Sequence, residues 1–145
     1  MEVLKGLLKE IGHNSWIYKE GKERNVYVLE TVCKELDFTF NPKNLTEEEK
    51  TSYLKGFFDA EGGVPHNGGR FYIQLVQKNL TKVELIKEIL TELGIKSGKI
   101  HNPSKRVDPD YWRIFVLADS QTRFASLIGS FHPVKSDIFR KRVVI

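Results

Sequence analysis

The sequence of 145 residues contains a single cysteine, Cys33. One thiol can form neither an internal disulfide framework nor a cysteine-cluster zinc site, and its expected role is that of a small buried apolar residue. The four histidines show no spacing typical of a zinc site either. The shortage of cysteine therefore predicts a chain that folds without disulfides in a reducing, intracellular compartment.

Long apolar runs are also missing. None approaches the roughly 18 residues that cross a membrane, and the first residues, MEVLKGLLKEIG, mix acids with apolar side chains, unlike a signal peptide. The sequence has no glycine-rich phosphate loop and no nucleophile elbow. We expect a cytoplasmic protein with no membrane partner and no small-molecule cofactor.

The composition that is present is ordinary for a globular protein of about one domain, with 40% hydrophobic and 29% charged residues. A net charge of +4 permits binding to nucleic acid but does not require it. The placement of the charges is therefore more informative than their sum.

Hydrophobic periodicity and turn residues divide the chain into helices and strands. The pattern predicts helices at 2–12, 46–61, 80–94 and 119–131, and strands at 15–18, 25–30, 69–77, 98–102 and 111–118. The helix at 46–61 is the best defined, because Thr46 and Glu49 form a capping-box pattern and Gly62-Gly63 ends it as a turn.

Two parts of this order resemble each other. The stretch EVLKGLLKEIG from Glu2 aligns without a gap on ELIKEILTELG from Glu84, and NVYVLE matches RIFVLA once loop lengths are adjusted. Any two amphipathic helices that end in glycine look alike, but the matching order of helix, strand, loop and strand favours an internal repeat. We therefore predict a partial unit at 1–38, a linker at 39–45 and a complete unit at 46–145.

The helix at 46–61 has two contrasting faces. Small residues recur every four positions on one face, and large apolar residues occupy the other. The small set is Ser52, Gly56 and Ala60, and the apolar set is Leu54, Phe57 and Phe58. Because a smooth face lets another helix approach closely, we predict that Ser52, Gly56 and Ala60 form a homodimer interface.

Glu61 ends this helix, where a negative charge opposes the helix dipole. In a symmetric pair of helices, both copies of Glu61 would lie near the twofold axis, and two carboxylates repel unless cations lie between them. Acids around a divalent metal are what phosphodiester hydrolysis uses. The alternative is a solvated acid before a Gly-Gly turn.

The stretch YLKGFFDAEGGV resembles the signature of the LAGLIDADG homing endonucleases. Two positions depart from the motif: Lys55 replaces a small residue, and Glu61 stands where aspartate is commonest. The resemblance continues through FYIQLVQKN, the second strand pair and FHPVKSDIF. It implies an α+β fold of order αββαββα, with an antiparallel sheet saddle backed by helices and a partial repeat before it.

The resemblance also assigns roles to single residues. Glu61 matches the metal-binding acid and the carbonyl of Ala60 the group that assists it, with Mg²⁺ as the implied cofactor. Gln77 matches a polar residue that orients water in the active site, and Lys135 matches a basic residue near the scissile phosphate. Gln77 could instead close the edge of the core, and Lys135 could be an ordinary surface lysine. Asp59 fits a structural cap better than a metal ligand, since it points roughly opposite to Glu61.

Alternation along the predicted strands places polar side chains on the outer face of the sheet, away from the core. A strand pair that carries arginine and glutamine can read base edges in the major groove of DNA. The predicted DNA-binding residues are Arg70, Tyr72, Gln74 and Arg113 from strands, and Lys105 and Arg106 from a loop, with His66 and Asn67 in a second loop. A solvated sheet face is the alternative for any one of them.

Together these features predict a metal-dependent, site-specific endonuclease for double-stranded DNA, of the homing type and acting as a homodimer. The alternative is a LAGLIDADG protein without catalysis that binds nucleic acid, either an RNA maturase or a DNA-binding regulator. Whether the chain is intron-encoded, intein-derived or a fragment of a longer protein stays open.

Overall fold

The computed structural model describes residues 1–34, 44–65 and 70–143. The chain divides into two compact units, Met1–Phe40 and Asn41–Ile145. Most of the predicted linker at 39–45, together with His66 and Asn67, falls outside the described residues. Among the described residues, none of the helices combines the length and the apolar character that a membrane crossing requires.

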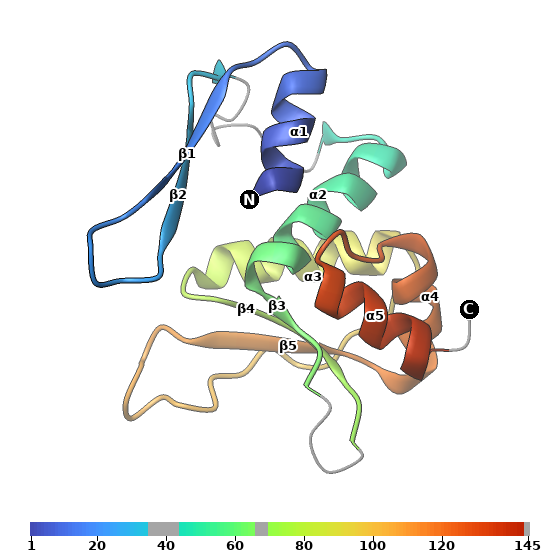
Figure 1. The fold of residues 1–145 in the computed structure, drawn as a ribbon. Helices are drawn as coiled ribbons and strands as arrows, with labels where there is room; N and C mark the ends of the chain where they lie inside the picture. The colour runs from blue at the N-terminus through green and yellow to red at the C-terminus, as the bar shows by residue number, and fades with distance from the viewer. Residues whose placement is uncertain (35–43, 66–69, 144–145) are drawn as a thin grey trace. The chain divides into compact units, whose positions relative to one another are not determined.

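The first unit contains a helix and a strand pair (Figure 1). Helix α1 (Glu2–Glu10) is followed by β1 (Ser15–Lys19) and β2 (Tyr27–Thr31), which pair antiparallel. Gly12 takes a left-handed φ of +84° just beyond α1, a conformation that glycine adopts without strain. Cys33 is buried, as its sequence context predicts.

The described residues of the second unit form four α-helices and a three-stranded sheet. Its elements are α2 (Glu47–Glu61), β3 (Gly62–Gly63), β4 (Ile73–Gln77), α3 (Leu80–Glu92), β5 (Trp112–Val116), a 3₁₀ turn (Ala118–Ser120), α4 (Gln121–Leu127) and α5 (Pro133–Arg142). The strands lie in the order β3-β4-β5 and are antiparallel. Bridges from Ser97 to Val116 and from His101 to Arg113 extend the sheet beyond β5. The α+β fold and its order of elements are those that the resemblance implies.

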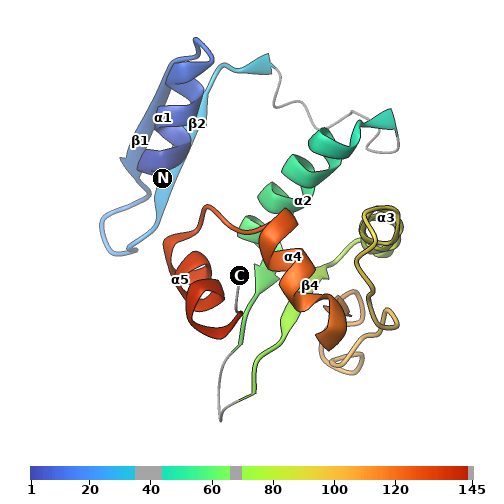
Figure 2. The ribbon, with the colours of Figure 1, turned by 90° about the vertical axis from the view of Figure 1, so that its right-hand side faces the viewer.

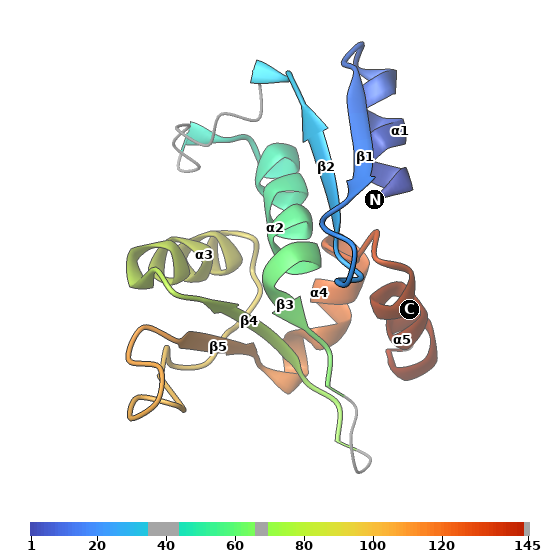
Figure 3. The same ribbon diagram turned by 60° about the vertical axis from the view of Figure 1, so that its left-hand side comes forward.

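The four helices of this unit lie on one face of the sheet, so its other face is not covered by helices (Figure 1). Helix α2 is central, with α3 on one side of it and α4 and α5 on the other (Figure 2, Figure 3). The core lies between helices and sheet. The ring of Phe58 on α2 lies 5.1 Å from that of Phe124 on α4 and 5.6 Å from that of Phe139 on α5, centroid to centroid.

The strands differ from the sequence prediction in their lengths. Strand β4 begins at Ile73, which pairs with Val116, the last residue of β5. The residues before Ile73 therefore have no partner in β5. The glycines predicted as a turn form β3, in which Gly62 pairs with Leu75. The predicted strand at 98–102 pairs with β5 only through isolated bridges.

The helix predicted at 119–131 is also shorter than expected. It comprises a 3₁₀ turn and α4, which ends at Leu127 before Gly129 takes a φ of +61°. Periodicity does not reveal α5, since Phe139 is its one fully buried side chain. Pro133 begins this helix, a position where its missing N–H has no cost.

Candidate functional site

Helix α2 begins with the predicted capping box. The backbone N–H of Thr46 donates to Glu49 Oε2 at 2.8 Å, and the backbone N–H of Glu49 donates to Thr46 Oγ1 at 3.3 Å. The hydrogen bond from the Thr46 backbone is the main cause that lowers the pKa of Glu49. These bonds fix where α2 starts, and therefore where its last turn falls.

The face of small residues on α2 is open. Ser52, Gly56 and Ala60 are all exposed, and a Cβ atom added to Gly56 would meet no heavy atom within 4 Å beyond its chain neighbours and the backbone of its own helix. The face is therefore smooth and accessible, as an interface between two helices requires. Its use as a dimer interface stays a prediction.

Two groups of the predicted metal site are adjacent at the end of this face. Ala60 and Glu61 are exposed in the last turn of α2, which contains no basic residue. Among the described residues, no group of three or more His, Cys, Asp or Glu side chains is placed to hold a metal ion. In the predicted metal site, one copy of the chain would contribute one carboxylate and one carbonyl, fewer than the six or more oxygen ligands that a hard divalent cation prefers.

Gly62 allows the chain to pass from α2 into β3 in close contact with Phe58. A Cβ atom at this position would lie 2.1 Å from Cδ2 and 2.6 Å from the carbonyl oxygen of Phe58. Only glycine avoids this overlap, so the step from α2 to β3 depends on Gly62. The same step fixes where Glu61 stands relative to the sheet.

Asp59 connects α2 with the turn between α4 and α5. Its carboxylate accepts hydrogen bonds from the hydroxyl of Ser130 and from the backbone N–H of Phe131, the latter at 2.9 Å. Both bonds support the structural role that the sequence favours for Asp59. Ser130 was not singled out in the sequence, because it is 71 residues away along the chain.

Lys135 in α5 reaches the same end of α2. Its Nζ donates to the carbonyl oxygens of Phe58 at 2.7 Å and Asp59 at 2.9 Å. Burial lowers the pKa of Lys135, and the carboxylates of Asp59 and Glu61 oppose that shift. The structure thus brings the predicted basic residue close to the predicted metal-binding acid, although its role in cleavage stays a prediction.

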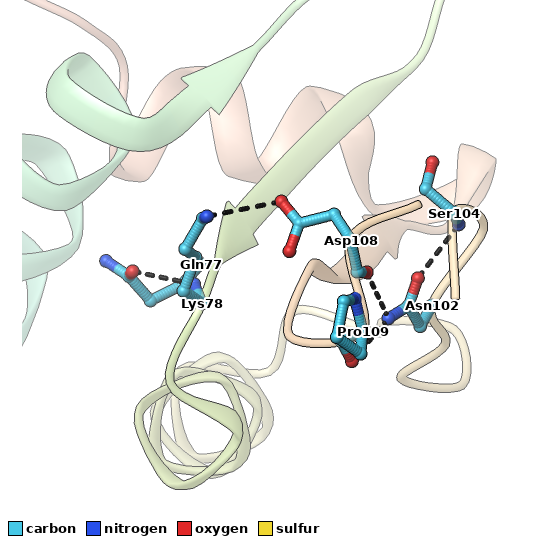
Figure 4. Close-up of polar contacts among 6 residues, drawn as sticks. All are labelled: Gln77, Lys78, Asn102, Ser104, Asp108 and Pro109. Atoms are coloured by element: carbon cyan, nitrogen blue, oxygen red, sulfur yellow. Dashed lines mark hydrogen bonds and ion pairs between the residues drawn. The ribbon is translucent and has the colours of Figure 1, made fainter. Parts of the chain in front are cut away.

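Gln77 ends β4 near the same helix. Since Gly62 pairs antiparallel with Leu75, Gln77 lies two residues past that partner, in the direction from which α2 arrives. Its Oε1 accepts a hydrogen bond from the N–H of Lys78 at 2.7 Å (Figure 4). The position fits both interpretations, a residue that orients water and one that closes the edge of the core.

The outer face of the sheet carries the predicted strand residues. The guanidinium of Arg113 lies 5.4 Å from the ring centroid of Tyr111 and 5.6 Å from that of Phe115. Tyr72 packs edge-on against Phe115 at 5.4 Å between centroids, and His101 stacks on Phe115 at the same distance. Sequence reasoning missed Phe115 and His101, although alternation along β5 places Phe115 on the face of Arg113.

Two polar atoms on this face have no hydrogen-bond partner among the described residues. They are Oε1 of Gln74 and Nε of Arg113, both buried from water by their neighbours. A buried polar atom without a partner costs free energy, so such atoms in a native protein require an explanation. A ligand could reach these two atoms only if the side chains of Gln74 and Arg113 turned outward, because neither atom is accessible to solvent.

The loop that contains Lys105 and Arg106 has an internal framework of hydrogen bonds among Asn102, Ser104, Asp108 and Pro109 (Figure 4). Asn102 donates to the carbonyl oxygens of Asp108 at 2.9 Å and Pro109 at 2.7 Å, and accepts from the N–H of Ser104 at 2.8 Å. An ion pair of 3.3 Å between Lys78 and Asp108 ties the loop to the end of β4. Both predicted basic residues are exposed on this loop, and Arg70 is exposed before β4.

Comparisons with known proteins agree on a single fold. Residues 48–129 match the family model of the LAGLIDADG-like domain. The homing endonuclease I-ApeI of Aeropyrum pernix is 33% identical over 85 residues, which are 58% of this chain and 36% of that protein. The chain thus spans little more than a third of the length of this curated relative.

Two solved structures illustrate the range of this fold. The crystal structure of I-DmoI in complex with DNA and Ca superposes with a TM-score of 0.70 at 18% identity, covering 97% of this chain and 74% of that chain. The N-terminal LAGLIDADG domain of DUF199/WhiA superposes with a TM-score of 0.65 at 14% identity, covering 97% and 69%.

Proposed function

Because the chain belongs to the LAGLIDADG homing endonuclease family, we propose that it is a site-specific endonuclease for double-stranded DNA. In this proposal, it cuts at a site that two units share. The observation that carries the proposal is the end of α2, where an exposed Glu61 follows an open face of small residues. Two such helices in contact bring two copies of Glu61 together.

The residues at this end fit a divalent cation. The carboxylate of Glu61 and the carbonyl of Ala60 are oxygen donors, and one chain alone lacks a complete set of ligands among its described residues. A second unit and the phosphates of the substrate supply the remainder in this proposal. When bound, Mg²⁺ provides the Lewis-acid chemistry of phosphodiester hydrolysis. The structures of I-DmoI with DNA and Mn or Ca support the use of a divalent metal.

The residues of the chain have separate roles in the proposed reaction. Glu61 holds the cation and repels the second carboxylate when the cation is absent. Lys135 places a positive charge where negative charge develops on the phosphate, and Gln77 orients water. Because Lys135 is held by two carbonyl oxygens, 2.7 and 2.9 Å away, its position is set before DNA binds.

The outer face of the sheet provides the proposed sequence recognition. Arginine pairs with the O6 and N7 of guanine, and glutamine pairs with the N6 and N7 of adenine. Arg113 and Gln74 are the proposed readers of base edges and would turn outward to make these contacts, whereas Arg70, Lys105 and Arg106 are exposed and suit the phosphate backbone. Tyr72 supports the face through its contact with Phe115.

A second candidate function is nucleic-acid binding without cleavage. The similarity to the LAGLIDADG domain of DUF199/WhiA favours it, since that domain covers the same 97% of the chain. In this alternative, the chain is a DNA-binding regulator or an RNA maturase. The sheet face would then bind nucleic acid while the end of α2 has no catalytic role.

The distinguishing experiment is cleavage of DNA that carries candidate insertion sites, with and without Mg²⁺. We expect the wild-type protein to cut, and Glu61→Gln to abolish cutting while DNA affinity stays within about tenfold, because a metal ligand and a repelling charge are both removed. Glu84→Gln is the matched control, since Glu84 is exposed on α3 and loses the same charge. Cutting by Glu61→Gln at the wild-type rate would contradict the assignment. Tight binding to DNA or intron RNA without metal, and without any cutting, would support the second candidate.

A further inference from the structure

Helix α2 holds the turn between α4 and α5 at two places. Asp59 accepts hydrogen bonds from Ser130 and Phe131 of this turn. One helical turn earlier on α2, the ammonium of Lys55 lies 4.7 Å from the ring centroid of Phe131. Lys55, which departs from the family motif, therefore contacts the same turn as Asp59.

The turn between α4 and α5 also determines where α5 begins. The hydroxyl of Ser130 accepts a hydrogen bond at 3.0 Å from the backbone N–H of His132, the residue just before the helix. Pro133 follows, and its fixed φ suits the first residue of a helix. A chain of hydrogen bonds thus runs from the carboxylate of Asp59 through Ser130 to the start of α5.

This arrangement delivers Lys135 to the end of α2. The third residue of α5 is Lys135, and its ammonium donates to the carbonyl oxygens of Phe58 and Asp59. Asp59 therefore acts twice: its side chain holds the turn that precedes α5, and its backbone accepts the lysine that α5 carries. A long lysine side chain is flexible unless such contacts fix it.

The charges at the end of α2 show how the helix tolerates the carboxylate of Asp59 in its last turn. A carboxylate in the last turn opposes the helix dipole, and this turn has no basic residue of its own. The ammonium of Lys135 supplies the missing positive charge from another helix. The carboxylate of Asp59 is unfavourable for the isolated helix, but the ammonium of Lys135, which Asp59 helps to place, compensates its charge.

We propose that Asp59 is a positioning residue, which fixes the ammonium of Lys135 at the end of α2 by holding the turn between α4 and α5. The expected effect on cleavage rests on the proposed function. The placement of Lys135 does not, so the two can be tested separately.

The placement is tested by NMR on the free protein, without DNA or metal. We expect a lysine ammonium signal of Lys135 that exchanges slowly with water, because two carbonyl oxygens hold it. Asp59→Asn should abolish this signal, since the amide can accept only through its single oxygen and loses the negative charge. Asp137→Asn is the matched control: it removes one charge from α5, where Asp137 pairs with Arg140 and Lys141, and should leave the signal unchanged.

A slow ammonium signal that persists in folded Asp59→Asn would overturn the proposal. Should that variant fail to fold, Ser130→Ala decides, because it keeps the carboxylate and removes the link to His132. Loss of the signal in Ser130→Ala supports the proposal, and its retention overturns it.

Cleavage kinetics provide the second test. We expect Asp59→Asn to lower kcat by about tenfold or more with little change in KM, because it acts on the chemical step through Lys135. In a Lys135→Met background, the same change should cause almost no further loss. Losses that multiply in the double variant would overturn the positioning role. If the wild-type protein cuts no DNA, the proposed function fails, while the NMR result still decides whether Asp59 places Lys135.

Discussion

At the residue scale, Gly56 within α2 and Gly62 just after it differ in the space that they leave for a side chain. Gly62 has no room for a side chain, since a Cβ atom would lie 2.1 Å from the ring of Phe58, a ring that contacts both α4 and α5. Gly56 stands in the middle of the helix with open space around it. One glycine is required by packing, and the other leaves the outer face of the helix smooth.

We therefore expect Gly62→Ala to destabilise the protein by about 1–3 kcal/mol, as overpacking does in a dense core. Gly56→Ala is the matched control, and should stabilise the helix by about 0.5–1 kcal/mol because alanine restricts the unfolded chain and favours helix. Urea unfolding monitored by circular dichroism measures both changes. Equal effects of the two substitutions would show that the contact with Phe58 does not constrain position 62.

The sequence reveals the contacts of single residues at the candidate site unevenly. The pattern on α2 locates Glu61 and the small residues by itself, because periodicity and capping are local properties. It cannot reveal that Lys135 bonds to Phe58 or that Ser130 bonds to Asp59, since these pairs lie more than 70 residues apart. The resemblance to a family supplied Lys135, while no signal in the sequence pointed to Ser130.

At the element scale, α2 has one buried face and one open face, and we predict that the open face contacts a partner. Leu54, Phe57 and Phe58 are buried, whereas Ser52, Gly56 and Ala60 are exposed. The predicted partner face is a stripe one side chain wide, and a large side chain in its middle keeps two helices apart.

Gly56→Leu should therefore separate the predicted dimer, which sedimentation velocity would detect as a monomer or as aggregates. Thr81→Leu is the control, since it adds the same side chain at an exposed position of α3. A cleaving dimer of normal mass in the Gly56→Leu variant would show that the contact lies on another element.

The elements themselves differ in how well sequence predicts them. Helix α1 has strong apolar periodicity, α2 begins with a capping box, and glycines follow the ends of α1, α2 and α3, so each of the three was predicted within a few residues. Helix α5 buries one side chain fully, so no pattern marks it. The two-residue strand β3 is too short for alternation to show, and only its pairing with β4 reveals it.

At the scale of the whole molecule, helix α1 of the first unit carries apolar side chains that are exposed. The alignment of its helix on α3 pairs Leu4, Leu7 and Ile11 with three buried residues, Ile86, Ile89 and Leu93. Yet Leu4, Leu7 and Ile11 are 52%, 41% and 62% exposed. The partial repeat stays a prediction, and it would account for this contrast: β4, which packs against α3 together with β5, has no counterpart among residues 1–34.

Deleting residues 1–38 should keep metal-dependent cutting at the same DNA sequence, because the second unit holds α2, the sheet and Lys135. We expect the deletion variant to have a lower solubility or a lower Tm. The apolar stripe of α1 is expected to pack on the second unit or on the partner chain, and the deletion would expose the surface that it covers. Cleavage mapping and thermal unfolding of the deletion variant, beside the full chain, check both outcomes. A folded, dimeric deletion variant that cuts nothing would show that the first unit belongs to the active architecture.

The hydrogen bond between Lys135 and the carbonyl of Asp59 joins positions 76 residues apart. Ribosomes add about 5–20 residues per second, so the end of α2 emerges roughly 4–15 s before the lysine that completes it. In a nascent chain, Asp59 is therefore made several seconds before Lys135. The proposed cutting site is therefore completed only after most of the chain has been made.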